Sequence, residues 1–417
     1  MANKANIEME QHSPVPRIRT DLEIIPTSYQ GQRALLVRDS LGLIRNPVLL
    51  QGDALSLVSL IDGKRTARDI QVELVRVKKG MLVDLSQVER MVAELDAAFL
   101  LQSHFYHREK ERLVSEYARL EVREPSHAGL SYPADPEELR RYLGSILESS
   151  GGEEESSARG QVCALVAPHI DLETGKRVYA KAYRAIRERR CRRVFLLGTG
   201  HSQDDGFFCL TEKHFQTPLG LVKTDREVVQ KLKKAGGPAV GRSDIFHRRE
   251  HSLEFQVLFL QHLFGDSFVI VPILCGSFAA ELGRVSRPSG IKNVAPFVRA
   301  LRQCWDEARE GSFFVAGVDF SHVGPKFGHR ERAASLILEA RHHDRKLLEA
   351  LTRGDAKAFW AESWKARDKY NICGFSSLAL LLDVFPGARG RVLDYEFWQE
   401  EATQSAVSFA AAVLDVS

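Results

Sequence analysis

Three apolar segments of strand length in this chain each lead into a histidine. Apolar runs without alternation are typical of strands buried on both faces, as in a parallel sheet covered by helices. In such sheets the ligand crevice lies outside the carboxyl ends of the strands, so the three imidazole rings are expected to meet there. Neutral imidazole binds iron, copper and zinc, and near pH 7 it also transfers protons. The segments are residues 162–168 before His169, 194–200 before His201 and 313–321 before His322.

A metal ion at this edge needs a third ligand besides His169 and His201, and Cys373 is a candidate. Cys373 precedes Gly374 and an apolar, helix-like segment, residues 378–382. A thiolate at a helix N-terminus is favoured electrostatically, which makes it a good ligand or nucleophile. Taken alone, however, Cys373 fits a small buried hydrophobic residue better.

Asp319 and His322 form a second candidate group, because they lie three residues apart in one predicted loop. A neutral imidazole is a natural general acid or base, and a nearby carboxylate can orient the ring. The alternative is that Asp319 only caps the loop.

His251 and Glu254 form a third group at the start of a predicted helix, residues 250–262. Their i, i+3 spacing places them on nearly the same helix face. With one histidine, the segment is not the HExxH motif of zinc proteases. It fits residues that support a metal ligand or contact a substrate, and it fits a solvated helix start equally well.

Strand-like and helix-like segments alternate from residue 162 onward, which predicts an α/β domain with a mostly parallel central sheet flanked by helices. Before it, a hairpin and three short helices predict a small α+β domain of winged-helix type. The charged run 105–125 fits a solvated helix that connects two domains. The expected organisation is a disordered N-terminus at 1–15, a small domain at 16–105, a linker at 106–122 and the α/β domain at 123–417.

The bulk composition is that of a globular protein. Of the 417 residues, 44% are hydrophobic and 27% are charged, and the net charge of +3 argues against a nucleic-acid-binding protein. Six cysteines without a CxxC pair fit a reducing cytoplasm. No secretory signal and no apolar run of membrane-spanning length occur in the sequence, so a soluble cytoplasmic protein is expected.

Seven ordered motifs give the chain a resemblance to the Memo-like family, called AmmeMemoRadiSam system protein B in bacteria and archaea. The resemblance covers about residues 123–417 and implies a fold similar to class III extradiol dioxygenases. The motifs begin at Ser126, Ala167, Leu197, Glu250, Val318, Ile372 and Ser405.

The resemblance also implies site residues and partners. It matches His169, His201 and Cys373 to metal-binding positions, and Asp319 and His322 to other active-site positions. It implies iron or copper, redox behaviour, and association with a radical SAM protein and with protein A of the same system. The family often has Arg after its Cys-Gly motif, whereas this chain has Phe375.

Residues 16–105 more weakly resemble PqqD-like winged-helix domains, which bind peptide leaders. Three functions therefore remain open. The first is metal-dependent redox or dioxygenase-like chemistry on a small or peptide-bound substrate. The second is a non-catalytic adaptor that holds a peptide for partner enzymes. The third is a thiol hydrolase that uses Cys373, His322 and Asp319.

Overall fold

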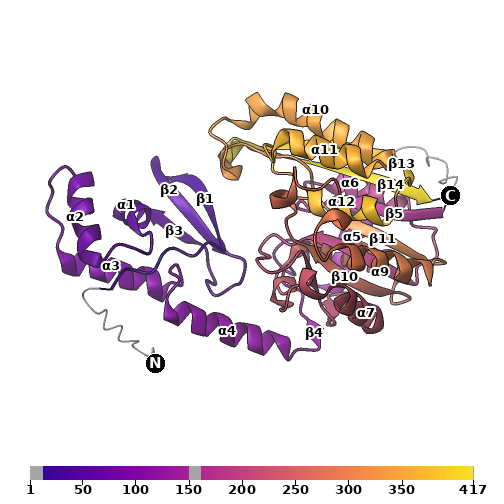
Figure 1. The fold of residues 1–417 in the computed structure, drawn as a ribbon, viewed down its shortest axis with the longest axis horizontal. Helices are drawn as coiled ribbons and strands as arrows, with labels where there is room; N and C mark the ends of the chain where they lie inside the picture. Colours follow the sequence, from indigo (N-terminus) through magenta and orange to yellow (C-terminus); the bar gives the residue numbers. More distant parts are fainter. Residues whose placement is uncertain (1–12, 150–160, 417) are drawn as a thin grey trace. The chain divides into compact units, whose positions relative to one another are not determined.

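The computed structural model describes residues 13–149 and 161–416 and divides into two compact units, Met1–Tyr117 and Ala118–Ser417 (Figure 1). The division between Tyr117 and Ala118 falls within residues 106–122, the segment that the sequence predicts to be a linker. Each unit has its own sheet and its own apolar core.

The smaller unit contains the predicted hairpin and helices. Strands β1 and β2 pair antiparallel, and β3 extends the sheet beside β2. Leu57, Ile70 and Val88 are fully buried in the core that the helices form. The assignment of this unit to the winged-helix or PqqD-like class remains a prediction. Its elements are β1 Leu22–Tyr29, β2 Gln32–Asp39, β3 Val48–Gln51, α1 Asp53–Leu60, α2 Ala67–Val77, α3 Leu85–Ala97 and α4 His104–Ala118.

Most of the segment predicted to be disordered, residues 1–15, lies outside the described residues. Its last part is folded, because Pro14 forms a bridge with Thr66 and Val15 is buried in the core. The ordered part of the small unit therefore begins before residue 16.

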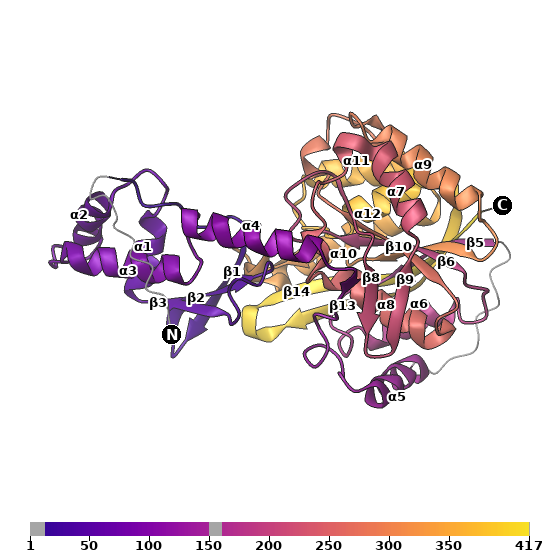
Figure 2. The same cartoon turned by 90° about the horizontal axis from the view of Figure 1, so that it is seen from below.

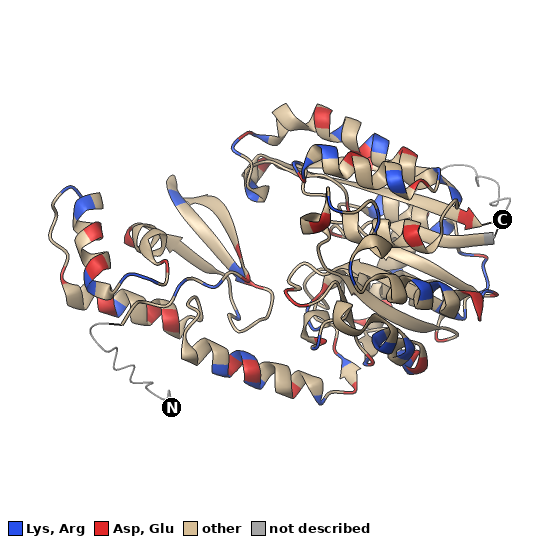
Figure 3. Ribbon diagram, in the orientation of Figure 1, with Lys and Arg blue, Asp and Glu red and all other residues tan. Residues whose placement is uncertain are grey.

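The predicted linker, residues 106–122, contains nearly all of helix α4, His104–Ala118. Lys and Arg alternate with Asp and Glu along this helix (Figure 3), and Arg112 pairs with Glu109 and Glu116. Such i, i+3 and i, i+4 pairs stabilise an exposed helix. Tyr106 is buried and donates a hydrogen bond to Asp21, so the helix start packs on the small unit.

The larger unit has a parallel centre and antiparallel flanks. Strands β5, β11, β6 and β10 lie side by side and parallel, as predicted. At one flank β14 pairs antiparallel with β5, and at the other β8 pairs antiparallel with β9. Its elements are β4 Val122–Arg123, α5 Pro136–Glu148, β5 Gln161–Ala167, α6 Lys176–Arg184, β6 Arg193–Thr199, β7 Phe208–Leu210, β8 His214–Thr217, β9 Gly220–Thr224, α7 Arg226–Gly236, α8 His251–Phe264, β10 Val269–Cys275, α9 Ala295–Asp306, β11 Ser312–Gly317, β12 His322–Val323, α10 Ala333–Thr352, α11 Ala356–Ala366, α12 Phe375–Val384, β13 Arg389–Glu400 and β14 Ser405–Val416.

Helices cover both faces of this sheet (Figure 2). Helices α6 and α8 pack on one face, and α7, α9 and α12 pack on the other. The central strands are buried on both sides, which explains why their sequences are continuously apolar. No helix among the described residues is both long and apolar enough to cross a bilayer.

A long hairpin of β13 and β14 closes one flank of the sheet, and the strand–helix alternation of the sequence does not predict it. Its twelve-residue strands pair along their whole length, with a register shift between Val392 and Asp394. Strand β14 also pairs with β12, which carries His322. The hairpin therefore fixes the loop that presents His322.

Candidate metal centre

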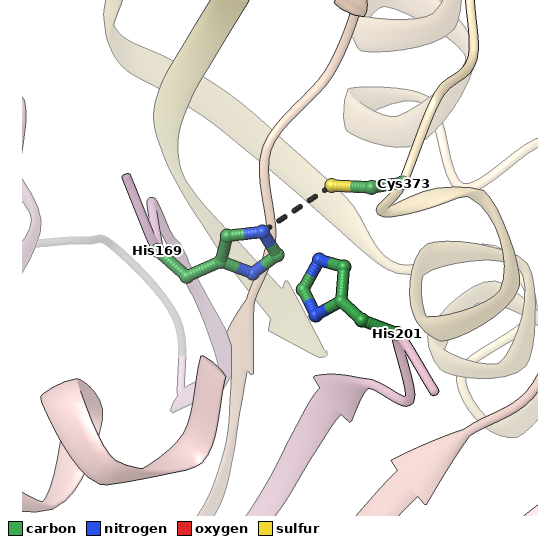
Figure 4. A group of neighbouring side chains, drawn as sticks. All are labelled: His169, His201 and Cys373. Carbon is green, nitrogen blue, oxygen red and sulfur yellow. Dashed lines mark hydrogen bonds between the residues drawn. The ribbon is translucent and has the colours of Figure 1, made fainter. Parts of the chain in front are cut away.

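The carboxyl ends of three adjacent central strands deliver the predicted site residues. In the order β5, β11, β6, these strands are followed by His169, Asp319 and His201. Cys373 reaches the same place from the segment before α12. One donor atom from each of His169, His201 and Cys373 lies within 4.8 Å of the others (Figure 4). The structure thus brings together the three residues that the sequence nominates as metal ligands.

Two glycines allow the backbone to pack closely around this site. A Cβ atom on Gly374 would lie 2.7 Å from the carbonyl oxygen of Asp319, and one on Gly317 would lie 2.3 Å from that of Ser252. Gly374 donates its N–H to Asp319, and Thr199 donates its hydroxyl to the carbonyl of Cys373. The Cys-Gly pair is therefore held against the ends of β11 and β6.

The Nδ1 atoms of three site histidines each lie beside an oxygen acceptor. His169 faces the carbonyl of Gly317 at 2.9 Å, and His322 faces the carbonyl of Phe320 at 3.0 Å. His201 faces the carboxylate of Glu250 at 3.0 Å. A carbonyl can only accept, so Nδ1 of His169 and His322 must carry the proton. Their Nε2 lone pairs are left available for a metal or a proton.

The donor spacing fits one ion. A tetrahedral metal with bonds of about 2.0–2.3 Å to nitrogen and sulfur holds such donors roughly 3.5 Å apart. Cys373 Sγ lies 3.4 Å from His169 Nε2. His169 is 3% exposed, whereas the side chain of His201 is 37% exposed, so the group is open on the His201 side. Two imidazoles and one thiol are donors suited to iron, copper or zinc.

Asp319 contacts His169 directly. One carboxylate oxygen accepts the backbone N–H of His169 at 3.0 Å, and the other lies 3.7 Å from His169 Nε2. Asp319 acts on His322 through its charge, and the His322 ring is oriented by the Phe320 carbonyl. A backbone carbonyl thus orients the His322 ring, and the roles of Asp319 and His322 in catalysis stay predictions.

His251 extends the cluster of rings. Its ring stacks on His201 with centroids 5.0 Å apart and meets His169 edge-on at 5.1 Å. His127 meets His251 edge-on at 5.7 Å. His251 therefore lies beside two of the predicted ligands, and its role there stays a prediction.

Glu254 lies in a separate buried network. It accepts hydrogen bonds from Ser126, from the His127 backbone and from Tyr132, and it forms an ion pair with Arg123. These partners hold the segment that places His127, so Glu254 supports the ring cluster only indirectly. The carboxylate that adjoins both His201 and His251 is that of Glu250. The only signal for this in the sequence is an acidic residue immediately before a helix.

Burial sets the charge state of most site groups. It lowers the pKa of His169 to about 3 and also lowers the pKa of His251 and His322, so these rings are neutral near pH 7. Burial raises the pKa of the Cys373 thiol and raises that of Asp319 to about 6.

His201 behaves differently from the other rings. Burial would lower its pKa, but the Glu250 carboxylate and Cys373 outweigh burial and raise it. Glu250 itself has a lowered pKa, because its attraction to His201 outweighs its own burial. A metal that binds here must therefore displace protons from His201 and Cys373.

Phe375 does not face the site. It is buried, and its ring lies parallel to Phe359 at 5.9 Å and beside Trp360 at 5.1 Å. The side chain that follows the Cys-Gly pair is thus part of the apolar core.

Comparison with known proteins places the same region in one family. The family model described as Memo-like protein matches residues 123–413. A MEMO1 family protein of Aquifex aeolicus is 30% identical over 91% of this chain and 95% of its own length. A MEMO1 family protein of Thermus thermophilus is 29% identical over 84% of this chain and 99% of its own length. Both alignments are longer than the larger unit and so extend into the smaller one.

Proposed function

Because the chain belongs to the Memo-like family, we propose that it is a metal-dependent protein whose larger unit performs redox or dioxygenase-like chemistry. His169, His201 and Cys373 would hold one iron or copper ion. The substrate would be small or carried on a peptide. A bound iron or copper ion would supply electron transfer, which no side chain of this site supplies.

One observation supports this proposal most strongly. Three donor atoms from distant parts of the chain lie within 4.8 Å of one another, close enough to surround one ion. The Nδ1 atom of each of the two imidazoles lies beside an oxygen acceptor. A purely structural cluster would not need Nε2 atoms aimed at a thiol. The buried, neutral His169 is suited to ligation, because a protonated ring could not bind a cation.

Asp319 and His322 are the residues that would handle protons. His322 is neutral, and its Nε2 can accept a proton while the Phe320 carbonyl fixes the other nitrogen. Asp319 has a pKa of about 6, so near neutral pH it can both hold and release a proton beside His169. His201 and His251 form the exposed rim through which a substrate would enter.

The decisive experiment is metal analysis of anaerobically purified protein. We expect the wild type to retain iron or copper, and the double variant His169→Ala/Cys373→Ser to retain almost none, because two of three ligands are gone. Elemental analysis measures the content, and circular dichroism verifies that the variant is folded. Equal metal content in both folded proteins would refute the proposal.

The thiol hydrolase is less well supported than the metal centre. A nucleophilic cysteine requires a lowered pKa, whereas burial raises the pKa of Cys373.

An adaptor role for the smaller unit is a second proposal, and exposed apolar side chains favour it. Val77, Met81 and Leu82 are 57%, 65% and 89% exposed at the end of α2 and in the turn after it. We propose that this surface contacts a peptide or the radical SAM protein and protein A of the same system. Exposed apolar groups that gather in one place often mark interaction sites.

The adaptor proposal predicts a loss of binding from surface changes alone. The double variant Met81→Ser/Leu82→Ser should weaken capture of the radical SAM protein at least about tenfold, because buried apolar contacts carry such interfaces. Leu130→Ser, which changes a residue that is 78% exposed in the larger unit, is the control. Unchanged capture by the double variant in a pull-down would argue against the adaptor.

A further inference from the structure

Among the described residues, Glu250 is the only one whose carboxylate lies beside both His201 and His251, the exposed histidines of the site. One of its oxygens lies 3.0 Å from Nδ1 of His201 and 3.3 Å from Nδ1 of His251. Its side chain is 4% exposed, so water competes little for these contacts. A buried carboxylate needs partners, and it finds them in these rings and in two backbone N–H groups.

The two backbone contacts fix the carboxylate itself. The first oxygen also accepts the N–H of Ser252, which makes Glu250 the N-cap of α8. The second oxygen accepts the backbone N–H of His201 at 3.2 Å. Glu250 therefore contacts both the backbone and the ring of His201, and its hydrogen bonds connect the segment after β6 to the start of α8.

His201, Glu250 and His251 also lie close enough to hold an ion, since their donor atoms fall within 4.8 Å of one another. The hydrogen bonds argue against that use. The oxygens of Glu250 already accept N–H groups, and an ion bound to Nδ1 of His201 would break the contact that orients the ring. Glu250 thus fits a hydrogen-bond acceptor better than a ligand.

We infer that Glu250 is a positioning residue, which keeps the proton of His201 on Nδ1 so that Nε2 faces Cys373 as a free donor. The inference rests on the proposed function, because a free Nε2 atom matters only if His201 binds a metal. The hydrogen-bond arrangement itself can be tested without any metal. His169 needs no such residue, because a backbone carbonyl does the same for it. At His201 a side-chain carboxylate takes this place.

Glu250→Gln tests the inference because it keeps the size of the side chain and replaces one acceptor oxygen with a donor. Both carboxylate oxygens lie 3.0 to 3.1 Å from Nδ1 of His201, so the amide would offer that atom one acceptor and one donor, and the neutral ring would no longer be held with its proton on Nδ1 alone. Nuclear magnetic resonance of ¹⁵N-histidine-labelled full-length protein without metal, at alkaline pH where the ring is neutral, distinguishes the two forms. We expect the proton on Nδ1 in the wild type and a measurable share of it on Nε2 in the variant.

Metal affinity provides the second measurement, with Zn²⁺ as the probe in competition with a chelating dye. Loss of a carboxylate that supports a histidine ligand typically costs 10–100-fold in affinity, and we expect that range for Glu250→Gln. Glu250→Asp should keep the helix cap, because Asp is a favoured N-cap residue, but its carboxylate is shorter by about 1.5 Å. We expect this variant to melt near the wild-type temperature and to lose at least about tenfold in Zn²⁺ affinity.

The control for the capping role is Asp135→Ala, which removes the N-cap of α5 away from the site. It should lower the melting temperature without changing the His201 proton or the Zn²⁺ affinity. The inference is overturned if folded Glu250→Gln keeps the proton on Nδ1 as completely as the wild type, or if both Glu250 variants bind Zn²⁺ within twofold of the wild type. Binding of two Zn²⁺ ions per wild-type chain would also overturn it, because Glu250 would then be a ligand. A wild type that binds none of Zn²⁺, iron and copper would refute the proposed function alone, since the proton position would still decide the role of Glu250.

Discussion

Replacing Cys373 with serine is expected to weaken metal binding at least about 100-fold, beyond the usual effect of removing a residue that merely supports a ligand. Serine is nearly isosteric with cysteine, and its hydroxyl can still donate to the Asp319 carbonyl that Sγ contacts at 3.4 Å. The fold should therefore survive. What is lost is the soft sulfur donor, which a neutral hydroxyl does not replace.

The spectrum of the Co²⁺-substituted protein separates this explanation from a general loss of affinity. At a Co²⁺ concentration that saturates both proteins, the sulfur-to-metal charge-transfer band should be present in the wild type and absent from Cys373→Ser. Cys191→Ala is the matched control, because Cys191 is a buried cysteine outside the site. A charge-transfer band that persists in Cys373→Ser would show that Cys373 is not a ligand.

Glu254→Ala is expected to produce the largest loss of stability, about 3–5 kcal/mol in the free energy of unfolding. The side chains of Glu254 and Arg123 are each 1% exposed. Removing the carboxylate leaves the Arg123 charge buried without its partner. The hydroxyl groups of Ser126 and Tyr132 also lose the acceptor of their hydrogen bonds. Uncompensated buried charge is among the costliest defects that one substitution can create.

Urea denaturation followed by tryptophan fluorescence can measure this loss of stability in the larger unit alone. All four tryptophans lie in the larger unit, so their signal does not report on the smaller one. Glu137→Gln is the control, because Glu137 is 77% exposed in its pair with Arg140 and should change stability by less than about 0.5 kcal/mol. Similar unfolding midpoints for Glu254→Ala and Glu137→Gln would mean that the buried network contributes little.

The sequence predicts the placement of His169, His201 and Asp319 well, because each follows an uninterrupted apolar strand and parallel strands end at one edge. It predicts Cys373 less directly, since a cysteine before an apolar helix is equally typical of a core. Family resemblance, and not spacing, raised Cys373 to a ligand.

Other parts of the site depend on contacts that no local pattern encodes. The carbonyls of Gly317 and Phe320 become acceptors only through the path of the chain after β11. Glu254 meets Arg123 across more than a hundred residues, which its spacing from His251 does not indicate. The β13–β14 hairpin escaped prediction because the half-buried β13 mixes charged and aromatic residues.

The separation of Cys373 from His169 by 204 residues has a thermodynamic consequence. An unfolded polymer has a negligible chance of gathering these donors, so an ion would associate almost exclusively with the completed fold. Ligand linkage then adds about 2.7 kcal/mol to apparent stability when the free ion is 100 times its dissociation constant. The supply of that ion in the surroundings would thus govern how much of the chain persists in its folded form.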